Sequence, residues 1–397
     1  MTSPPRVAVI TPGSFPIPSP TSSSVERVVE QFVPLLRPFA EPRIYGRTAL
    51  GLPRVGQVAD VVCERFPASN KLHYIEEVSR AIQSFSPSII QVENRPQYML
   101  KLRERHPAAK LWLNLHSSTF ITPSAIAIPR LHQSLQAADR ILVNSQYLRR
   151  IIAARAPEAA AKLRVIYPGV QTDRFLSQYS VEGESRRAAI RQDRGLQGRK
   201  VILFMGRLLP LKGVHHLLHI APALIAEHPN VKLVIVGSPF YGSHRTTAYA
   251  RELFRIGAKY PSHIAFIPYV PYTKVPDWFL AADIAVVPSG SREAFGLVNV
   301  EAMASGVPVV ATRAGGIREI IRNGQTGYLI RPESIQGDLL SHLSMLLRDD
   351  ILREQMGRAS RERVEQTFTW RRTADRWLDI MREPWQREGR NEFTMGE

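Results

Sequence analysis

The chain has 397 residues, enough for two domains of ordinary size with separate cores. Its formal net charge of +17 favours an anionic partner, such as a nucleotide sugar, an acidic acceptor or an anionic membrane surface. Nucleic acid is the least favoured partner because the sequence has no basic run or RNA-binding signature. A soluble cationic protein without such a partner is the alternative.

Cysteine content and apolar patterning limit the compartment. Cys63 is the only cysteine, so an intrachain disulfide is excluded. The N-terminus has no cleavable apolar segment, and no window approaches about 18 consecutive apolar residues. We therefore expect a cytoplasmic protein that contacts a membrane at most peripherally.

The first half of the chain alternates strands with helices. Apolar runs predict strands at 7–11, 60–65, 89–92, 111–115, 141–143 and 163–167, and helical periodicity predicts helices at 23–36, 72–85, 96–106 and 146–154. The loop before the first helix is rich in proline and serine, and ends at Ser23 and Ser24. Either serine is suited to cap that helix or to meet a ligand.

Polar side chains follow two of these strands. His116 comes directly after strand 111–115, and Asn94 and Arg95 come after strand 89–92. Ligands of open α/β sheets bind at the carboxyl ends of strands, so His116 is a candidate to bind a sugar hydroxyl or position an acceptor. Asn94 and Arg95 are candidates to contact an acceptor. The alternative for His116 is a surface histidine that closes the strand, and the alternative for Arg95 is an ion pair with a local carboxylate.

The second half begins with a charged linker and helix at 176–198 and then repeats the strand–helix rhythm from residue 201. Strand 201–205 is followed by Arg207 and Lys212, and a helix is expected to start near Gly213. Two cations on one loop at a strand end can bind phosphates. Alone, such residues are usually solvated.

The stretch from Gly290 to Val310 is the strongest candidate site. It is preceded by an expected strand at 284–287, and its apolar spacing predicts a helix at 295–305. The first amides of that helix, at Gly296, Leu297 and Val298, are expected to face an anion. Glu293 and Glu301 would be about 12 Å apart if both were helical, a spacing that suits rings on either side of a diphosphate. The alternative is one glutamate that stabilises the helix dipole and another on a solvated face.

Further strands are expected at 231–236, which ends at Gly237, and at 263–267, which is followed by Tyr269 and Val270. The loop 239–247 after Gly237 is a candidate to touch a ligand, with a mobile surface loop as the alternative. Gly315 and Gly316 should form a close turn against the 295–305 helix. Three helices, at 334–347, 351–367 and 370–382, should close the chain.

These motifs together resemble the retaining nucleotide-sugar glycosyltransferases of family GT4. The resemblance rests on Arg207 with Lys212, on the Glu293–Phe295–Gly296 run with Glu301, on YPGVQTDRF from Tyr167 and on GGIREI from Gly315. The ENRPQY stretch from Glu93 and GSPFYGS from Gly237 are similar to the spore-coat-associated branch. Relatives have a Gly-Gly pair where this chain has Ser23 and Ser24, and usually Asn and Asp where it has Pro168 and Gln171.

The resemblance implies the GT-B architecture, with two Rossmann-like, doubly wound α/β domains that face a central cleft. Residues 1–172 would form the acceptor-side domain, 173–369 the nucleotide-sugar domain, 370–385 a helix that returns to the first domain, and 386–397 a disordered tail.

The resemblance also implies the roles of the site residues. Arg207 and Lys212 would bind the diphosphate, Glu293 the sugar hydroxyls and Glu301 the ribose, while His116 would contact the donor sugar or position the acceptor. The backbone of Tyr269 and Val270 would meet the base. The remaining donor-binding candidates are Gly237, Phe295, Gly296, Leu297 and Val298.

The expected enzyme is therefore a retaining hexosyltransferase that uses a nucleoside diphosphate sugar, with a UDP-sugar as the expected donor. The base, the sugar and the acceptor are not determined by the residues. The sequence has no Asp-x-Asp motif, so neither a metal ion nor another cofactor is expected. The alternatives are a nucleotide-sugar epimerase of the same architecture, or a non-catalytic coat protein that binds a sugar nucleotide.

Overall fold

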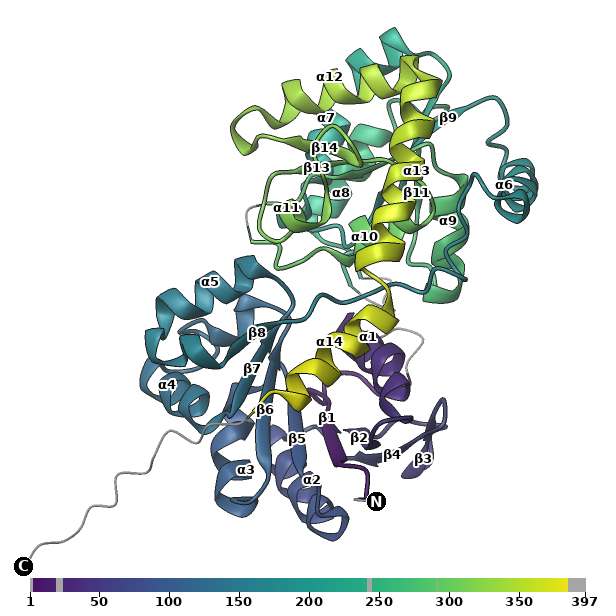
Figure 1. Ribbon diagram of the computed structural model, residues 1–397. Coiled ribbons are helices and arrows are strands. Elements are labelled where there is room, and N and C mark those ends of the chain that lie inside the picture. Colours follow the sequence, from purple (N-terminus) through teal and green to yellow (C-terminus); the bar gives the residue numbers. More distant parts are fainter. Residues whose placement is uncertain (1–2, 19–23, 241–244, 291, 385–397) are drawn as a thin grey trace, which may run out of the picture.

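The computed structural model describes residues 3–18, 24–240, 245–290 and 292–384. It contains two α/β domains stacked end to end, and the final helix passes from the second domain back to the first (Figure 1). The fold class expected from the sequence, two Rossmann-like domains in the GT-B arrangement, is confirmed.

The first domain is built on an eight-stranded sheet in the order β3-β4-β2-β1-β5-β6-β7-β8. Neighbouring strands are parallel except for the antiparallel pair β3 and β4. The strands are β1 (Arg6–Ile10), β2 (Glu41–Arg47), β3 (Val55–Val58), β4 (Val61–Phe66), β5 (Ile89–Glu93), β6 (Lys110–Leu115), β7 (Arg140–Val143) and β8 (Leu163–Val165).

Helices cover both faces of this sheet. One face packs against α2 to α5, and the other against α1, η1 and the C-terminal helix. The helices and 3-10 turns of this part are α1 (Ser24–Phe32), η1 (Val33–Leu36), α2 (Lys71–Phe85), η2 (Pro96–Tyr98), α3 (Met99–Arg105), η3 (Ser118–Ile121), α4 (Ile128–Ala137), α5 (Gln146–Arg155) and η4 (Pro157–Lys162).

The second domain has a six-stranded, entirely parallel sheet in the order β11-β10-β9-β12-β13-β14. Its central strands are continuous apolar runs because both faces are buried. The strands are β9 (Lys200–Met205), β10 (Val231–Val236), β11 (Ile264–Ile267), β12 (Ile284–Val287), β13 (Val309–Thr312) and β14 (Gly327–Ile330).

The helices and turns of the second part flank this sheet and are drawn from teal to yellow in Figure 1. They are α6 (Val181–Asp193), η5 (Pro210–Lys212), α7 (Val214–Glu227), α8 (Ala248–Gly257), η6 (Tyr272–Lys274), α9 (Val275–Ala281), α10 (Leu297–Ala304), α11 (Ile317–Ile320), η7 (Pro332–Ser334), α12 (Ile335–Arg348) and α13 (Asp350–Thr367). The final helix, α14 (Trp370–Arg382), packs on the first domain instead.

Most of the expected elements are present, with two helices shortened for local reasons. The helix expected at 23–36 ends at Phe32 and continues as η1, which contains Pro34. Because proline has no amide hydrogen, it cannot continue the helical hydrogen bonding. The helix expected at 96–106 begins as the 3-10 turn η2, with Pro96 in its first turn, before α3. The strands β2, β3 and β14 and the helices α4, α8, α9 and α11 were not predicted.

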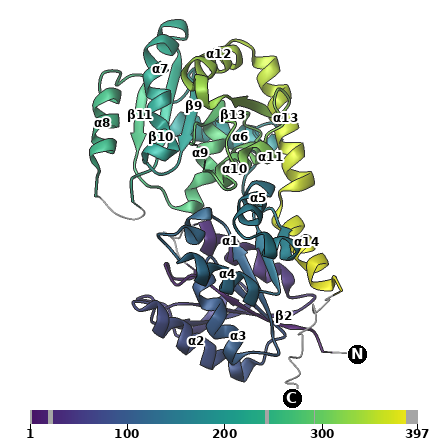
Figure 2. The ribbon, with the colours of Figure 1, turned by 90° about the vertical axis from the view of Figure 1, so that its left-hand side faces the viewer.

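The helix α14 joins the two domains. Figure 2 shows it continuing from α13 of the second domain onto the first. The centre of the Trp377 ring lies 4.9 Å from that of Trp112 on β6, and Trp377 Nε1 donates to Gln91 Oε1 at 2.7 Å.

The expected domain limits, 1–172 and 173–369 with 370–385 returning to the first domain, stay a prediction. Residues 386–397 lie outside the described part of the chain. No helix of the described part is long and apolar enough to span a bilayer.

We expect Trp377→Ala to destabilise the first domain by about 3–5 kcal/mol, because it removes a fully buried indole and leaves a cavity against Trp112. Urea unfolding followed by circular dichroism measures the change. Asp379→Ala, on the exposed side of the same helix, is the control and should change stability by less than about 1 kcal/mol. Equal unfolding midpoints for the two variants would contradict this account of α14.

Candidate functional site

The centre of the candidate site is an ion pair between Lys212 and Glu293. Lys212 is the last residue of η5, after β9, and Glu293 lies in the loop between β12 and α10. Lys212 Nζ lies 2.5 Å from Glu293 Oε2, and the two side chains are 26% and 17% exposed. Both groups are therefore held against each other and remain reachable by a ligand.

Close backbone packing brings the two loops together. Gly213, which follows Lys212, has a positive φ of 72°, and a Cβ there would lie 1.9 Å from the carbonyl oxygen of Pro288. The amide of Gly290 donates to the carbonyl oxygen of Leu211 at 2.8 Å. Only glycine allows this approach, so residue 213 determines where the lysine loop meets the end of β12.

The loop that carries Glu293 is supported from behind by the turn at Gly315 and Gly316. The amide of Gly316 donates to the carbonyl oxygen of Glu293 at 3.0 Å. A Cβ on Gly315 would lie 1.8 Å from the same oxygen, so a larger residue would displace the loop. The close turn expected from the sequence is confirmed.

Arg207 lies half-buried on the same loop as Lys212, three residues before η5 begins at Pro210. The helix α10 begins at Leu297, two residues later than expected, with Gly296 at its N-cap in the left-handed region. The first amides of α10, at Leu297 and Val298, have no helical partner at this position. Glu293 is not helical, so the spacing expected between it and Glu301 does not apply.

Glu301 lies inside the protein and not on a solvated face. Its carboxylate is 3.3 Å from Nη1 of Arg27 on α1 and accepts a hydrogen bond from Tyr272. The Arg27 guanidinium also stacks 3.6 Å from the centre of the Tyr272 ring. Burial raises the pKa of Glu301, and the positive charge of Arg27 opposes that shift. An arginine of the first domain thus neutralises the carboxylate expected to bind ribose.

Four other donor-binding candidates lie on the second domain. Tyr269 and Val270 lie half-buried between β11 and η6, the turn that carries Tyr272 beside Glu301. Gly237 packs against the backbone of Gly206, since a Cβ there would lie 1.9 Å from the Gly206 carbonyl oxygen. Phe295 is buried and stacks on Tyr167, so its ring is a packing residue and only its backbone is left for a ligand.

His116 is held from several sides at the end of β6. Its Nε2 lies 2.6 Å from Oε2 of Glu93, and its side chain is only 9% exposed, which excludes a surface histidine. Its amide donates to Asn94 Oδ1 at 2.8 Å, and its carbonyl oxygen accepts from Asn144 Nδ2 at 2.9 Å. These bonds define both the ring position and the backbone of His116.

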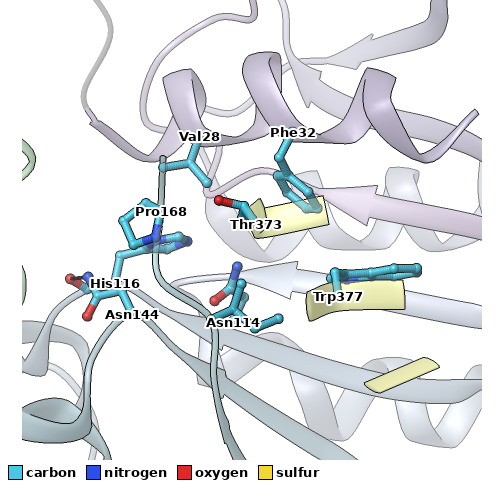
Figure 3. Close-up of a pocket in the computed structure, with 9 residues that line it drawn as sticks. Val28, Phe32, Asn114, His116, Asn144, Pro168, Thr373 and Trp377 are labelled. Carbon is cyan, nitrogen blue, oxygen red and sulfur yellow. Dashed lines mark hydrogen bonds between the residues drawn. The ribbon is translucent and has the colours of Figure 1, made fainter. Parts of the chain in front are cut away.

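Glu93 is completely buried, and its other oxygen accepts from Gln91 Nε2 at 2.6 Å and, more weakly, from Asn114 Nδ2 at 3.4 Å. Gln91 in turn accepts from Trp377 of α14. His116 and Trp377 line a small pocket between α1, β6 and α14 (Figure 3). A carboxylate that accepts from Nε2 leaves Nδ1 as the nitrogen that can bond a ligand.

The two halves of the site meet at the ends of β7 and β12. Ser145, next to Asn144, donates its hydroxyl to the carbonyl oxygen of Ala294 at 2.6 Å, one residue after Glu293. Glu319 of the GGIREI motif accepts from the amides of Gln146 and Tyr147 at 2.8 Å and so caps α5 of the other domain. The segment that holds the backbone of His116 thus contacts the loop that carries Glu293.

Sequence reasoning missed Glu93 and Arg27 as site residues. The sequence does hold a signal for Glu93: it is a charged residue in a strand that is apolar except for Glu93 itself and Gln91. Arg27 has none, because its partner is 274 residues away in the chain. Ser23 and residues 241–244 of the candidate loop 239–247 lie outside the described residues, and Ser24 is the first residue of α1. Within the described part of the chain, no group of three or more His, Cys, Asp or Glu residues could hold a metal ion.

Two families match the chain, one for each half. Residues 6–174 match "Glycosyltransferase Family 4" and residues 186–363 match "Glycosyl transferases group 1". The fold, the facing strand ends and these matches define the class: the chain belongs to the GT4 family of glycosyltransferases.

Particular relatives agree with that class. The chain is 28% identical to spore coat protein SA of Bacillus subtilis, over 94% of this chain and 98% of that protein. It is also 28% identical to the putative glycosyltransferase YtcC of Bacillus subtilis, over 94% and 90% of the two chains. The crystal structure of Anabaena HepE in complex with UDP-glucose has the same fold, with a TM-score of 0.73, 20% identity and coverage of 95% and 99%.

We expect Glu93→Gln to lower the rate of sugar transfer by at least about tenfold, because the neutral amide no longer selects the Nε2–H form of His116. ¹⁵N NMR of the imidazole should show a change in tautomer, which a purely structural role would not produce.

Glu41→Gln, a change at an exposed carboxylate of the same domain, is the control and should alter neither reading. An unchanged His116 tautomer in Glu93→Gln would refute the positioning role of Glu93.

Proposed function

We propose that the protein is a retaining glycosyltransferase that moves a hexose-type sugar from a UDP-sugar to an acceptor bound against the first domain. The observation that carries the proposal is the Lys212–Glu293 pair beside the first amides of α10. The complex of HepE with UDP-glucose supports a UDP-sugar donor.

The two halves of the pair match the two halves of such a donor. Lys212 and Arg207 carry positive charge that complements the diphosphate, together with the amides of Leu297 and Val298. Glu293 can accept hydrogen bonds from two sugar hydroxyls. In the structure Lys212 and Glu293 neutralise each other, so donor binding exchanges an internal ion pair for bonds to phosphate and sugar.

The proposed reaction breaks the bond between the anomeric carbon and the phosphate oxygen and forms a bond from the acceptor oxygen to the same face of that carbon. The acceptor's proton passes to the leaving phosphate oxygen, which balances the transfer. Negative charge grows on the diphosphate as its bond breaks, and Arg207, Lys212 and the α10 amides stabilise it. No step of this proposal requires a metal ion.

Burial of His116 beside Glu93 supports its role in binding a donor hydroxyl or positioning the acceptor. Tyr269 and Val270 are proposed to meet the base, next to Glu301 at the ribose.

We propose a cytoplasmic location, with peripheral contact to an anionic membrane or to the spore coat. The charge of +17 and the similarity to spore coat protein SA support that contact. No observation favours an epimerase or a non-catalytic coat protein.

We expect Glu293→Gln to reduce sugar transfer by at least about a hundredfold without weakening uridine diphosphate binding, because the proposed bonds of the carboxylate to the donor are to sugar hydroxyls, which uridine diphosphate lacks. Lys212→Gln should instead weaken uridine diphosphate binding by about tenfold or more, since it removes a charge from the phosphate side. Isothermal titration and a transfer assay separate the two effects.

Glu252→Gln, at an exposed carboxylate of α8, is the matched control and should behave as the unchanged protein. Full turnover by Glu293→Gln would refute the sugar-side assignment.

The ribose assignment of Glu301 has its own test. We expect the protein to bind uridine diphosphate about tenfold more tightly than its 2′,3′-dideoxy analogue, because a carboxylate accepts the ribose hydroxyl protons. In Glu301→Gln this preference should fall to about threefold or less. Both affinities are measured by isothermal titration, and a preference that survives the substitution would place the ribose elsewhere.

A further inference from the structure

Three cations of the first domain converge on the loop after β1, away from the Lys212–Glu293 pair. Arg47 Nη1 donates to the carbonyl oxygen of Ser14 at 2.9 Å, and Arg95 Nη2 donates to the hydroxyl of the same serine at 2.7 Å. Lys71 donates to the carbonyl oxygens of Gly13 and, at 2.8 Å, of Ala68. We refer to Arg47, Lys71 and Arg95 as the β1-loop cluster.

Neutral groups hold the β1-loop cluster together. Within the described part of the chain, no carboxylate forms an ion pair with any of its three members, which differs from the pairing of Arg27 with Glu301. Arg95 donates to Ser14 and Asn94 and lies 4.5 Å from the centre of the Phe120 ring, so the alternative of a local carboxylate partner is wrong.

The cluster carries unfavourable repulsion and desolvation. Burial lowers the pKa of Lys71, and the charges of Arg95 and Arg47 lower it further. The negative charge that opposes this effect is that of the fully buried Glu26, so one negative charge faces three positive ones. Like charges gathered at a half-buried site are stabilised when an anion binds between them.

The position of the cluster suits an acceptor. Arg47 is the last residue of β2, Lys71 is the first residue of α2, and Arg95 follows β5. They therefore lie at the edge formed by the carboxyl ends of the strands, as does His116 after β6. The donor-side contacts come from the other end of that edge, where Ser145 after β7 meets Ala294. Arg47 is exposed and the other two are half-buried, so a ligand can reach them.

We propose that the β1-loop cluster binds a phosphate monoester carried by the sugar acceptor. The proposal rests on the proposed function, because it assigns a subsite of the same transfer reaction. A dianionic phosphate offers three oxygens to three cations, whereas a carboxylate has only one charge and two oxygens. The acceptor class is therefore a phosphorylated hydroxyl compound.

The test titrates inorganic phosphate into the full chain, with and without saturating uridine diphosphate, and follows binding by isothermal titration and ³¹P NMR. We expect phosphate to bind in both conditions and acetate to bind at least tenfold more weakly. Lys71→Gln, Arg95→Gln and the exposed Arg47→Gln should each weaken phosphate binding at least threefold without changing uridine diphosphate affinity.

Arg80→Gln, an exposed substitution on the same helix as Lys71, is the control and should leave phosphate affinity unchanged. Phosphate that binds equally well to all three cluster variants, or that is displaced by uridine diphosphate, overturns the proposal. If uridine diphosphate itself fails to bind, the proposed donor is wrong. The phosphate titration in the absence of uridine diphosphate still tests the β1-loop cluster. Thermal midpoints of the variants show whether each is folded.

Discussion

The site depends on the contact between the carboxyl ends of β9 and β12, where Lys212 meets Glu293. Neither side chain comes from a regular helix or strand, so loop packing must hold them in place. Gly213 against Pro288 and Gly315 against Glu293 supply that packing. The pair brings opposite charges to a half-exposed position, where a ligand with an anionic end and a hydroxylated end can replace both partners.

A second constraint acts between the domains. Glu319 caps α5, Ser145 bonds Ala294, and Arg27 reaches Glu301, so contacts of three chemical kinds cross the same interface. Each pairs a residue of one domain with a residue of the other. Polar contacts thus join the two domains, while α14 adds apolar packing on the first domain (Figure 2).

The polar chain from Trp377 through Gln91 and Glu93 to His116 links that packing to the site. It fills the centre of the first sheet with bonded polar groups where apolar side chains would be expected. Buried polar groups are tolerated only when their bonds are satisfied, so the chain specifies one arrangement of α14 and one position of the histidine.

Much of the fold followed from the sequence. The strands β10 and β12 and the helix α14 were predicted at their observed limits, because continuous apolar runs and helical periodicity depend on local spacing. The strand β2, EPRIYGR, was missed because charged residues, a proline and a glycine interrupt its pattern. The helix α9 is only seven residues long and too short for a clear periodicity.

The site divides in the same way. The sequence by itself determined which loops carry charge and which strand ends they follow, since these are properties of neighbouring residues, and so it indicated Lys212, Glu293 and His116. Only the tertiary structure decided that Arg27 neutralises Glu301, that Glu93 orients His116 and that three cations meet at the Gly13–Ser14 loop. Those contacts join residues far apart in the chain, and their distances depend on how two sheets and the helices between them pack.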